Sequence, residues 1–423
     1  MVSMNELKQD MITGMGYIGL DSGRLYRMRR GPKLIEAVAS GTTIIINDAT
    51  EGRPFRRLRV FGKSTQDGAP TPEAPVPIVS AGESGNIAVK VTGKNLLTGR
   101  LYYIDYSMGV GFIKNENEVS LPYAPKSETS GIGYVIPCAP EKHYAFSVTN
   151  PNENAVVAIS EYKTLEDAKN KENAIGFVAP SSASPYKSVY TSKGNGVLVC
   201  WIAGKWTDGK TTTHECTESE LLQLEIGSEA TTYEPYRAPQ TLTLQTPNGL
   251  PGVPVSEDGN YTDADGQQWV CDEIDLERGK YVQRVKEVNP ADYDDWILDD
   301  STEPIRFKVN RIPDTINERK RFEVLSNRFV FNSENKVGVS FAYADEIYFY
   351  LPSTVTTVEQ AKQWFVDNPT TLMYMLGTPI EINLTPEEIA AYKALRTYGP
   401  TTVVSNDAGA EMEVTYVADR KEN

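Results

Sequence analysis

The residues that could support nucleophilic or metal chemistry are few and scattered in this chain. It contains two histidines, His143 and His214, and four cysteines, at 138, 200, 216 and 271. Nucleophilic catalysis needs a serine or cysteine beside a histidine that a carboxylate orients, and no motif of that kind occurs. His214 and Cys216 are two residues apart, but no further metal ligand has a suitable spacing. We therefore predict no enzymatic activity, no metal site, no cofactor, and free, buried thiols.

Two short motifs look like ligand-binding loops but lack the context that such loops need. GMGYIG (14–19) has GxGxxG spacing, yet no hydrophobic strand precedes it and Gly23 would interrupt a following helix. DADG (263–266) could begin a calcium loop, but loop positions six and twelve hold Gln268 and Ile274. We interpret both motifs as turns. Two alternatives stay open: a structural calcium ion held by backbone carbonyls, and a carboxylate pair for glycoside hydrolysis among the 57 acidic residues.

Aromatic residues between positions 79 and 237 could form a platform for a sugar. The C–H face of a pyranose ring packs on aromatic side chains, while polar groups fix its hydroxyls. Trp201 lies in the apolar run GVLVCWIAGKW (196–206), so we expect it in the core. Trp206 ends that run beside glycine and charged residues and is the best candidate. The predicted ligand-binding residues are Trp206, Tyr186, Tyr190 and Tyr134.

Charge divides the chain into a basic head and an acidic body. The net charge is −15, but residues 1–66 hold 11 Lys/Arg against 6 Asp/Glu, a balance of +5. The predicted docking residues of this head are Arg24, Arg27, Arg29 and Arg30. They could contact nucleic acid or an acidic protein partner, and the overall negative charge favours the protein. No run of 18 apolar residues occurs, so we predict no membrane-spanning helix.

The elements that must position these residues are mainly strands. Strands with turn signals at short spacing favour a sandwich or jelly roll in the middle of the chain. Four prolines in DGAPTPEAPVPI favour a stiff, extended linker. The sequence therefore predicts a mainly β protein with four parts: 1–66, an N-terminal attachment head; 67–78, a Pro-rich linker; 79–237, a jelly-roll β-sandwich; and 238–423, a β-rich domain with two short helices.

Alternation and capping residues place individual elements. Leu58 and Val60 share one face of an expected strand, and NYTDADGQQWVCDEIDLERGKYVQRV (260–285) is typical of a β-meander with turns at Asp265-Gly266 and Arg278-Gly279. Thr164 could cap a short helix in TLEDAKNKEN. The two later helices are expected near 357–367, with Thr356 as the cap and Glu359 three residues on, and near 386–397, with Thr385 as the cap, Pro386 first and Glu388 closing the box.

Two phrases frame the predicted sandwich: GKNLL (93–97) and QLEIGSEATTYEPYR (223–237). Together with FGKSTQDGAPTPEAPVPI, LTLQTPNGLPGVPV, the 260–285 meander and TLMYMLGTPIEINLTPEEIAAYKALRTYGPTTVVSNDAGAEMEVTYVAD, they closely resemble phage minor structural proteins of Gram-positive hosts. The resemblance covers roughly residues 56–419. In that family, a jelly roll similar to carbohydrate-binding modules lies between the same two phrases.

The resemblance implies a virion component at the tail tip, baseplate or a fibre, made in the cytoplasm of the bacterial host. It implies a homotrimer that contacts other virion proteins, here through the N-terminal head, and that could bind host cell-wall glycan. A purely structural baseplate protein, or a capsid-decorating or head-fibre protein without glycan binding, is the alternative. No ligand residues transfer from the family to this sequence.

Overall fold

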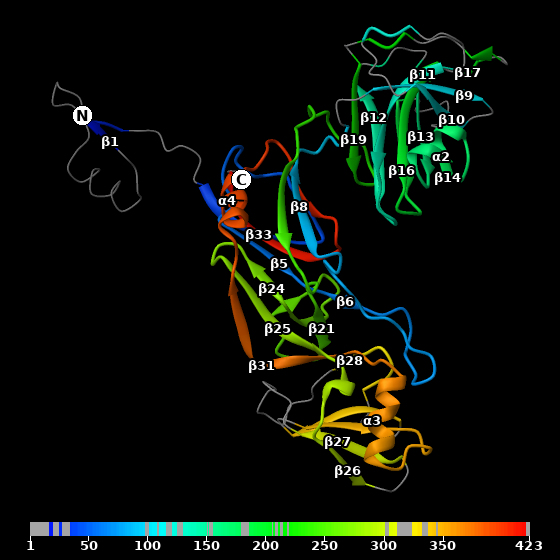
Figure 1. The fold of residues 1–423 in the computed structure, drawn as a ribbon. Coiled ribbons are helices and arrows are strands. Elements are labelled where there is room, and N and C mark those ends of the chain that lie inside the picture. Colours follow the sequence, from blue (N-terminus) through cyan, green and yellow to red (C-terminus); the bar gives the residue numbers. More distant parts are fainter. Residues whose placement is uncertain are drawn as a thin grey trace. The chain divides into compact units, whose positions relative to one another are not determined.

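The computed structural model confirms that the protein is mainly β (Figure 1). Among the residues that it describes, only three α-helices and one 3₁₀-helix interrupt the strands. The structure describes residues 17–19, 25–27, 34–97, 101–107, 110–115, 121–124, 130–149, 151, 155–178, 186–204, 206–207, 210–211, 215–217, 220–300, 304–310, 324–331, 337–343 and 346–419.

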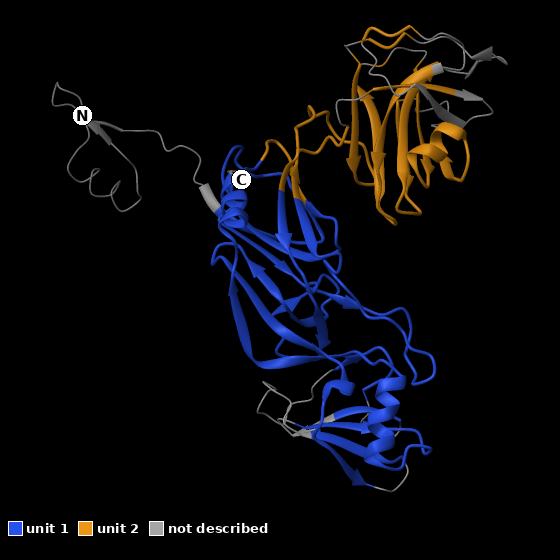
Figure 2. Ribbon diagram, viewed as in Figure 1, with its two compact units in different colours: residues 1–89, 242–397, 405–423 blue, residues 90–241, 398–404 orange. Residues whose placement is uncertain are grey.

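The chain folds into two compact units (Figure 2). Residues 90–241 and 398–404 form the sandwich unit, and residues 1–89, 242–397 and 405–423 form the frame unit. The chain therefore leaves the frame unit, builds most of the sandwich unit and then returns, so the sandwich unit is an insertion. The chain passes between the units within β8 (Asn86–Thr92), β20 (Gln240–Gln245) and β32 (Thr402–Asn406), which form a sheet with β4 (Thr43–Ile46) in the order β20-β8-β32-β4.

Two antiparallel sheets form the sandwich unit around a shared core. The core takes Ile132, Val157 and Ile202 from the larger sheet and Phe146 and Leu224 from the smaller one. The strands of the larger sheet, in order, are β10 (Val110–Asn115), β9 (Tyr102–Ser107), β11 (Ser130–Pro137), β16 (Val197–Gly204), β13 (Ala155–Tyr162) and β14 (Ala174–Val178). Those of the smaller are β15 (Lys187–Thr191), β12 (His143–Thr149) and β19 (Leu221–Ile226). The jelly-roll connection of these strands stays a prediction.

A short helix and a second apolar cluster complete this unit. Helix α2 (Leu165–Asn170) begins after Thr164, whose side chain accepts a hydrogen bond from the backbone N–H of Asp167, as predicted. Ala168 of the helix is buried with Val199 and Trp201 of β16. Both faces of β16 are therefore covered, which explains its continuous apolar run.

The frame unit is built on a seven-stranded sheet that draws its strands from both ends of the chain. Its order is β28 (Leu325–Ser326), β31 (Leu372–Asn383), β25 (Lys280–Val288), β24 (Glu273–Asp275), β5 (Arg57–Phe61), β33 (Glu411–Asp419) and β3 (Leu34–Gly41). Leu58 and Val60 of β5 are fully buried on one face, as the alternation predicts.

This sheet corrects the predicted head. The described part of residues 1–66 does not form a domain separate from the C-terminal region, because β5 lies between β24 and β33 and pairs with both. A charge balance over residues 1–66 reflects only those residues, whereas the partners of β5 lie more than 200 residues away in sequence. The pair β1 (Tyr17–Gly19) and β2 (Leu25–Arg27) is the only other described structure before β3.

The predicted linker 67–78 is instead a loop within the frame unit. It connects β6 (Ser64–Thr65) to β7 (Val79–Ser80), which pair with each other. The side chain of Gln66 donates to the carbonyls of Val76 and Ser326, and Arg328 donates to the carbonyl of Pro72. The prolines do make the segment extended, but hydrogen bonds to residues 326–328 hold it against the same unit.

A second sheet of the frame unit carries an aromatic core under helix α3 (Val358–Asp367). The ring of Phe365 lies 5.1 Å from Trp296 and 4.8 Å from Phe349. Thr357, not Thr356, caps α3, with Gln360 completing the box. Two adjacent Thr-x-x-Glu/Gln pairs occur here, so the pattern alone is ambiguous by one residue. The strands, in order, are β26 (Trp296–Asp300), β27 (Arg306–Asn310), β30 (Glu346–Tyr350) and β29 (Gly338–Tyr343), preceded by 3₁₀-helix η1 (Pro290–Asp292).

The remaining elements of the frame unit follow the sequence closely. Turns at Asp265-Gly266 and Arg278-Gly279 join β22 (Tyr261–Thr262) to β23 (Gln268–Cys271) and β24 to β25, and β21 (Gly252–Val255) pairs with β23. The predicted box of Thr385 and Glu388 caps α4 (Pro386–Ala394). This helix ends at Ala394 rather than near 397, because Leu395 has an extended backbone and is buried.

Candidate functional site

The predicted sugar platform is not an exposed row of aromatic rings. Tyr190 is buried, and its hydroxyl donates a 2.7 Å hydrogen bond to Oε2 of Glu161. In KSVYT (187–191) the residues alternate between exposed and buried, and Tyr190 falls on the inward face with Ser188. Tyr190 is therefore a core residue, which corrects the prediction for this position.

The other predicted tyrosines also contact the core. Tyr134 shares a face of β11 with Ile132 and Ile136, and both Tyr134 and Tyr186 are half-buried against the sandwich core. Trp206 lies in β17 (Trp206–Thr207), which pairs with β18 (Lys210–Thr211), and its side chain lies outside the described residues. These positions stay candidates for ligand binding, although neither described tyrosine presents a fully exposed ring.

Phe177 is an exposed aromatic side chain that the sequence analysis did not single out. Its ring is stacked 6.5 Å from the ring of Trp201, and 39% of the residue is exposed. Trp201 itself is buried, which confirms the sequence-based expectation. Phe177 lies on edge strand β14 in AIGFV, a run too short and apolar to show by periodicity which side chain faces solvent.

The two framing phrases close the sandwich unit by bonding to each other. Buried Asn95, from GKNLL, donates through its amide nitrogen to the carbonyls of Leu222 and Glu234. Its amide oxygen accepts from the N–H groups of Leu97 and Leu224. One side chain therefore satisfies three backbone groups of the two phrases and that of adjacent Leu222, which fixes the first and last segments of the unit side by side.

Charged residues strengthen the same closure. Lys94 forms a 3.0 Å ion pair with Glu234 and donates to Thr231. Glu234 also accepts two hydrogen bonds from Thr401, in the segment that returns from the frame unit. Glu225 accepts from the backbone and hydroxyl of Thr231. The conspicuous residues of both phrases are thus used within the fold.

A buried carboxylate near Tyr190 also has a structural role. Fully buried Glu161 accepts hydrogen bonds from Tyr190 and from the N–H groups of Lys193 and Gly194, which fixes the turn before β16. The thiol of Cys138 lies 3.8 Å from Oε1 of Glu161. Burial, and then the charge of Glu161, raise the pKa of Cys138 to about 11. This thiol stays protonated at neutral pH, so it is a poor nucleophile.

No metal-binding arrangement is present in the described part of the chain, where no three His, Cys, Asp or Glu residues gather to hold an ion. All four cysteines are free; three are buried and Cys138 is half-buried. His143 is exposed and bonds to Thr191, and His214 lies outside the described residues. In DADG, Oδ1 of Asp263 accepts from the N–H groups of Asp265 and Gln267, so this carboxylate closes a hairpin turn.

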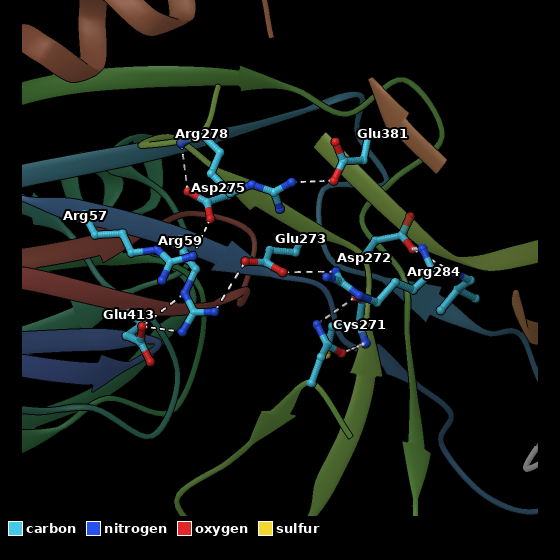
Figure 3. A network of polar contacts seen from close by, with 12 residues as sticks. Arg57, Arg59, Cys271, Asp272, Glu273, Asp275, Arg278, Arg284, Glu381 and Glu413 are labelled. Atoms are coloured by element: carbon cyan, nitrogen blue, oxygen red, sulfur yellow. Dashed lines mark hydrogen bonds and ion pairs between the residues drawn. The ribbon is translucent and has the colours of Figure 1, made fainter. Parts of the chain in front are cut away.

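A ladder of ion pairs crosses the large sheet of the frame unit (Figure 3). Arg59 of β5 bonds to Glu413 of β33 and lies 3.5 Å from Glu273 of β24, which is 3.0 Å from Arg284 of β25. Next to this row, Arg57 pairs with fully buried Asp275. The motif CDEIDLERG supplies three buried acids, and each has a partner. The sequence could not show the pairs made by Arg57 and Arg59, because their partners are far away along the chain, whereas Glu273 and Arg284 belong to one predicted hairpin.

Asp272, from the same motif, fills an irregularity of the sheet. Strand β31 pairs Ile380 with Gln283 and next Met375 with Val285, so four residues of β31 lie opposite Arg284 alone. Oδ1 of Asp272 accepts from the N–H groups of Arg284 and Val285, and Oδ2 accepts from the hydroxyl of Tyr281. Burial raises the pKa of Asp272 to about 6, although these hydrogen bonds act in the opposite direction.

A solvent-open cavity of about 820 Å³ lies beside this irregularity, within the frame unit. Asp272, Tyr281 and Val285 form part of its wall, together with Leu376 and Ile380 from β31. Ligand cavities commonly have volumes of about 300–1,000 Å³, and irregularities of a sheet often occur next to such sites. The cavity therefore has the size of a ligand site.

The predicted docking arginines lie largely outside the described residues. Arg27 ends β2, where it pairs with Tyr17, and its side chain is not described. Arg24, Arg29 and Arg30 lie wholly outside the described part of the chain. Of GMGYIG, Tyr17–Gly19 form strand β1, whereas a dinucleotide loop would lead into a helix at this point.

Comparison with known proteins does not place the chain in a family. No model of a known protein family matches it, and no curated protein is significantly similar to it. Among the described residues, no helix has the length and apolar character required to cross a bilayer.

Proposed function

We propose that this protein is a structural component of a bacteriophage tail, in a baseplate or fibre, which displays its inserted sandwich unit and contributes to recognition of the host surface. Its place would be on the virion, after synthesis in the host cytoplasm, as a homotrimer that contacts other virion proteins. The observation that carries the proposal is the way in which GKNLL and QLEIGSEATTYEPYR meet at Asn95 and close an inserted unit. These are the same phrases that resemble the phage family.

The architecture is consistent with a scaffold that carries a module and performs no catalysis. The buried acids of the frame unit are used in ion pairs and backbone contacts, and the thiol of Cys138 is protonated. In phage tails, weak contacts repeated over many copies produce strong attachment, because each additional contact acts at a high effective concentration. A single shallow site with a dissociation constant of about a millimolar, or about 4 kcal/mol, would therefore be sufficient.

Particle composition tests the proposal. Phage particles from a strain that encodes this chain are purified by density gradient and digested, and their peptides are quantified by mass spectrometry. We expect peptides of this chain in a fixed ratio to those of the tail proteins, with enrichment in tail fractions over capsid fractions. Their absence from infectious particles would exclude a virion role.

A purely structural role is the second candidate, and the burial of Tyr190 and the core contacts of Tyr134 and Tyr186 favour it. Competition separates the two candidates. The soluble full chain, added to host cells before the phage, should reduce adsorption if the protein recognises the host surface. Replacing exposed Phe177 by alanine tests the aromatic contact, and replacing Val189, which is 38% exposed in the same unit, is the matched control. Unchanged adsorption with the wild-type chain would leave only the structural role.

A further inference from the structure

The cavity of the frame unit has a lining suited to a hydroxyl-rich ligand. Amide and hydroxyl side chains contribute both donors and acceptors, and carboxylates contribute acceptors. A sugar hydroxyl is itself both a donor and an acceptor, so this mixture matches it. The polar side chains with amide or hydroxyl groups on the wall are Asn248, Gln283, Asn289, Asn327, Thr370 and Thr371. Of these, Asn289, Asn327 and Thr370 already bond to backbone groups of the protein.

Apolar side chains line the same cavity, and one of them is exposed. Val285 and Leu376 are buried, whereas Ile380 of β31 is 42% exposed. An exposed aliphatic side chain such as Ile380 can pack against the C–H face of a pyranose, although with less specificity than an aromatic ring. Polar groups beside this side chain in a cavity of about 820 Å³ are suited to an oligosaccharide of a few units.

The charge of the wall selects among sugars. Four carboxylates line the cavity, those of Glu83, Asp272, Glu287 and Asp292, against the single cation of Lys286. Partial burial and the charge of Glu83 raise the pKa of Glu287, so these two side chains repel each other. Neither forms an ion pair with any described residue. An added negative charge would be repelled here, whereas an ammonium group would relieve the repulsion.

We propose that this cavity binds a neutral or amine-bearing oligosaccharide and excludes uronates and phosphate-bearing glycans. The inference deepens the proposed host-surface recognition, on which it rests, and assigns the sugar contact to the frame unit rather than to the sandwich unit. Asn248 and Glu287 are the best test positions, because both are exposed and line the cavity. Their replacement therefore removes ligand contacts without opening a buried core.

The experiment uses the full chain on a glycan array that contains neutral, amine-bearing and uronate oligosaccharides, followed by saturation-transfer NMR on the strongest ligand. We expect binding to neutral and amine-bearing sugars and none to uronates. The double variant Asn248→Ala/Glu287→Ala should bind about tenfold more weakly. The matched control, Asn86→Ala/Glu257→Ala, changes an exposed asparagine and glutamate of the same unit outside the cavity and should bind as the wild type does.

A second variant tests the charge argument separately. The variant Glu83→Gln/Glu287→Gln keeps the size of both side chains but removes their charge. It should therefore still bind neutral sugars, but it should no longer prefer an amine-bearing sugar over the N-acetyl form of the same sugar. Absence of neutral and amine ligands on the array, uronate binding, or equal binding by Asn248→Ala/Glu287→Ala would each overturn the inference. The composition of phage particles is measured independently, so that result separates a failure of this site from a failure of the proposed virion role.

Discussion

At the scale of single residues, the acidic character of this chain has two different uses. Some carboxylates keep the surface charged, but Asp272, Glu273 and Asp275 of CDEIDLERG are buried, and the last two pair with arginines of β5, more than 200 residues away. Breaking one of these pairs would leave a buried charge uncompensated, which costs several kcal/mol. Asp272 differs from Glu273 and Asp275, which pair with arginine side chains. Its carboxylate accepts hydrogen bonds from two backbone N–H groups and from the hydroxyl of Tyr281, beside the cavity.

The pKa of Asp272 predicts a pH-dependent stability. Its pKa is about 6 in the folded state against an ordinary value of 3.8, so the folded state binds this proton more tightly than the unfolded state does. Stability from this group is therefore fully present below about pH 4 and is lost as pH rises to about 6, by roughly 3 kcal/mol. In Asp272→Asn, which cannot titrate, this component should disappear from urea unfolding curves measured between pH 4 and pH 7.

Asp265→Asn is the control for this measurement, because Asp265 is an exposed turn residue of the same unit. Its curves should keep the pH dependence of the wild type. If Asp272→Asn also keeps it, the buried carboxyl does not titrate in this range.

At the scale of elements, the closure of the sandwich unit depends on a few side chains that act as backbone partners. At the seam, the side chain of Asn95 joins GKNLL to strand β19 and to the segment that follows it through four hydrogen bonds. Such a residue is sensitive to substitution, since each unsatisfied buried backbone group costs about 1–3 kcal/mol. The start of helix α3 also depends on a single side chain, since Thr357 caps the helix and the adjacent Thr356 does not.

Replacement of Asn95 should selectively weaken the sandwich unit. Asn95→Ala removes both donors and the shared acceptor, so we expect a loss of about 2–4 kcal/mol in the free energy of unfolding of that unit. Urea unfolding followed by limited proteolysis measures this change. Asn86→Ala, at an exposed position of β8, should change stability by less than about 0.5 kcal/mol. Equal effects of the two substitutions would contradict the role assigned to the seam.

At the scale of the whole molecule, the frame unit is assembled from segments at both ends of the chain. Strands β3 and β5 pair with β33, and β5 also pairs with β24. The frame unit can therefore complete its sheet only after the C-terminal segment is available. Pairing over such long sequence distances is entropically costly and slows folding.

Leu58→Ala tests this arrangement. Leu58 is fully buried in β5, so the cavity left by its replacement should cost about 2–5 kcal/mol. Hydrogen exchange should then increase in β24 and β33 as well as in β5, because they belong to one sheet. Val38→Ala changes a residue of β3 that is 62% exposed and should leave these rates unchanged. Faster exchange restricted to residues 1–66 would support a separate head instead.

The local features of this protein follow from its sequence alone. Alternation identified buried faces such as those of Leu58 and Val60, and turn and cap residues located the 260–285 meander and α4. These features depend on neighbours within a few residues. Other features emerge only when the chain is folded: which strands pair, that residues 66–78 fold back on their own unit, that Tyr190 is a core residue, and that Asp272 lies at a cavity. These outcomes depend on partners far apart in the chain, whose proximity no local pattern encodes.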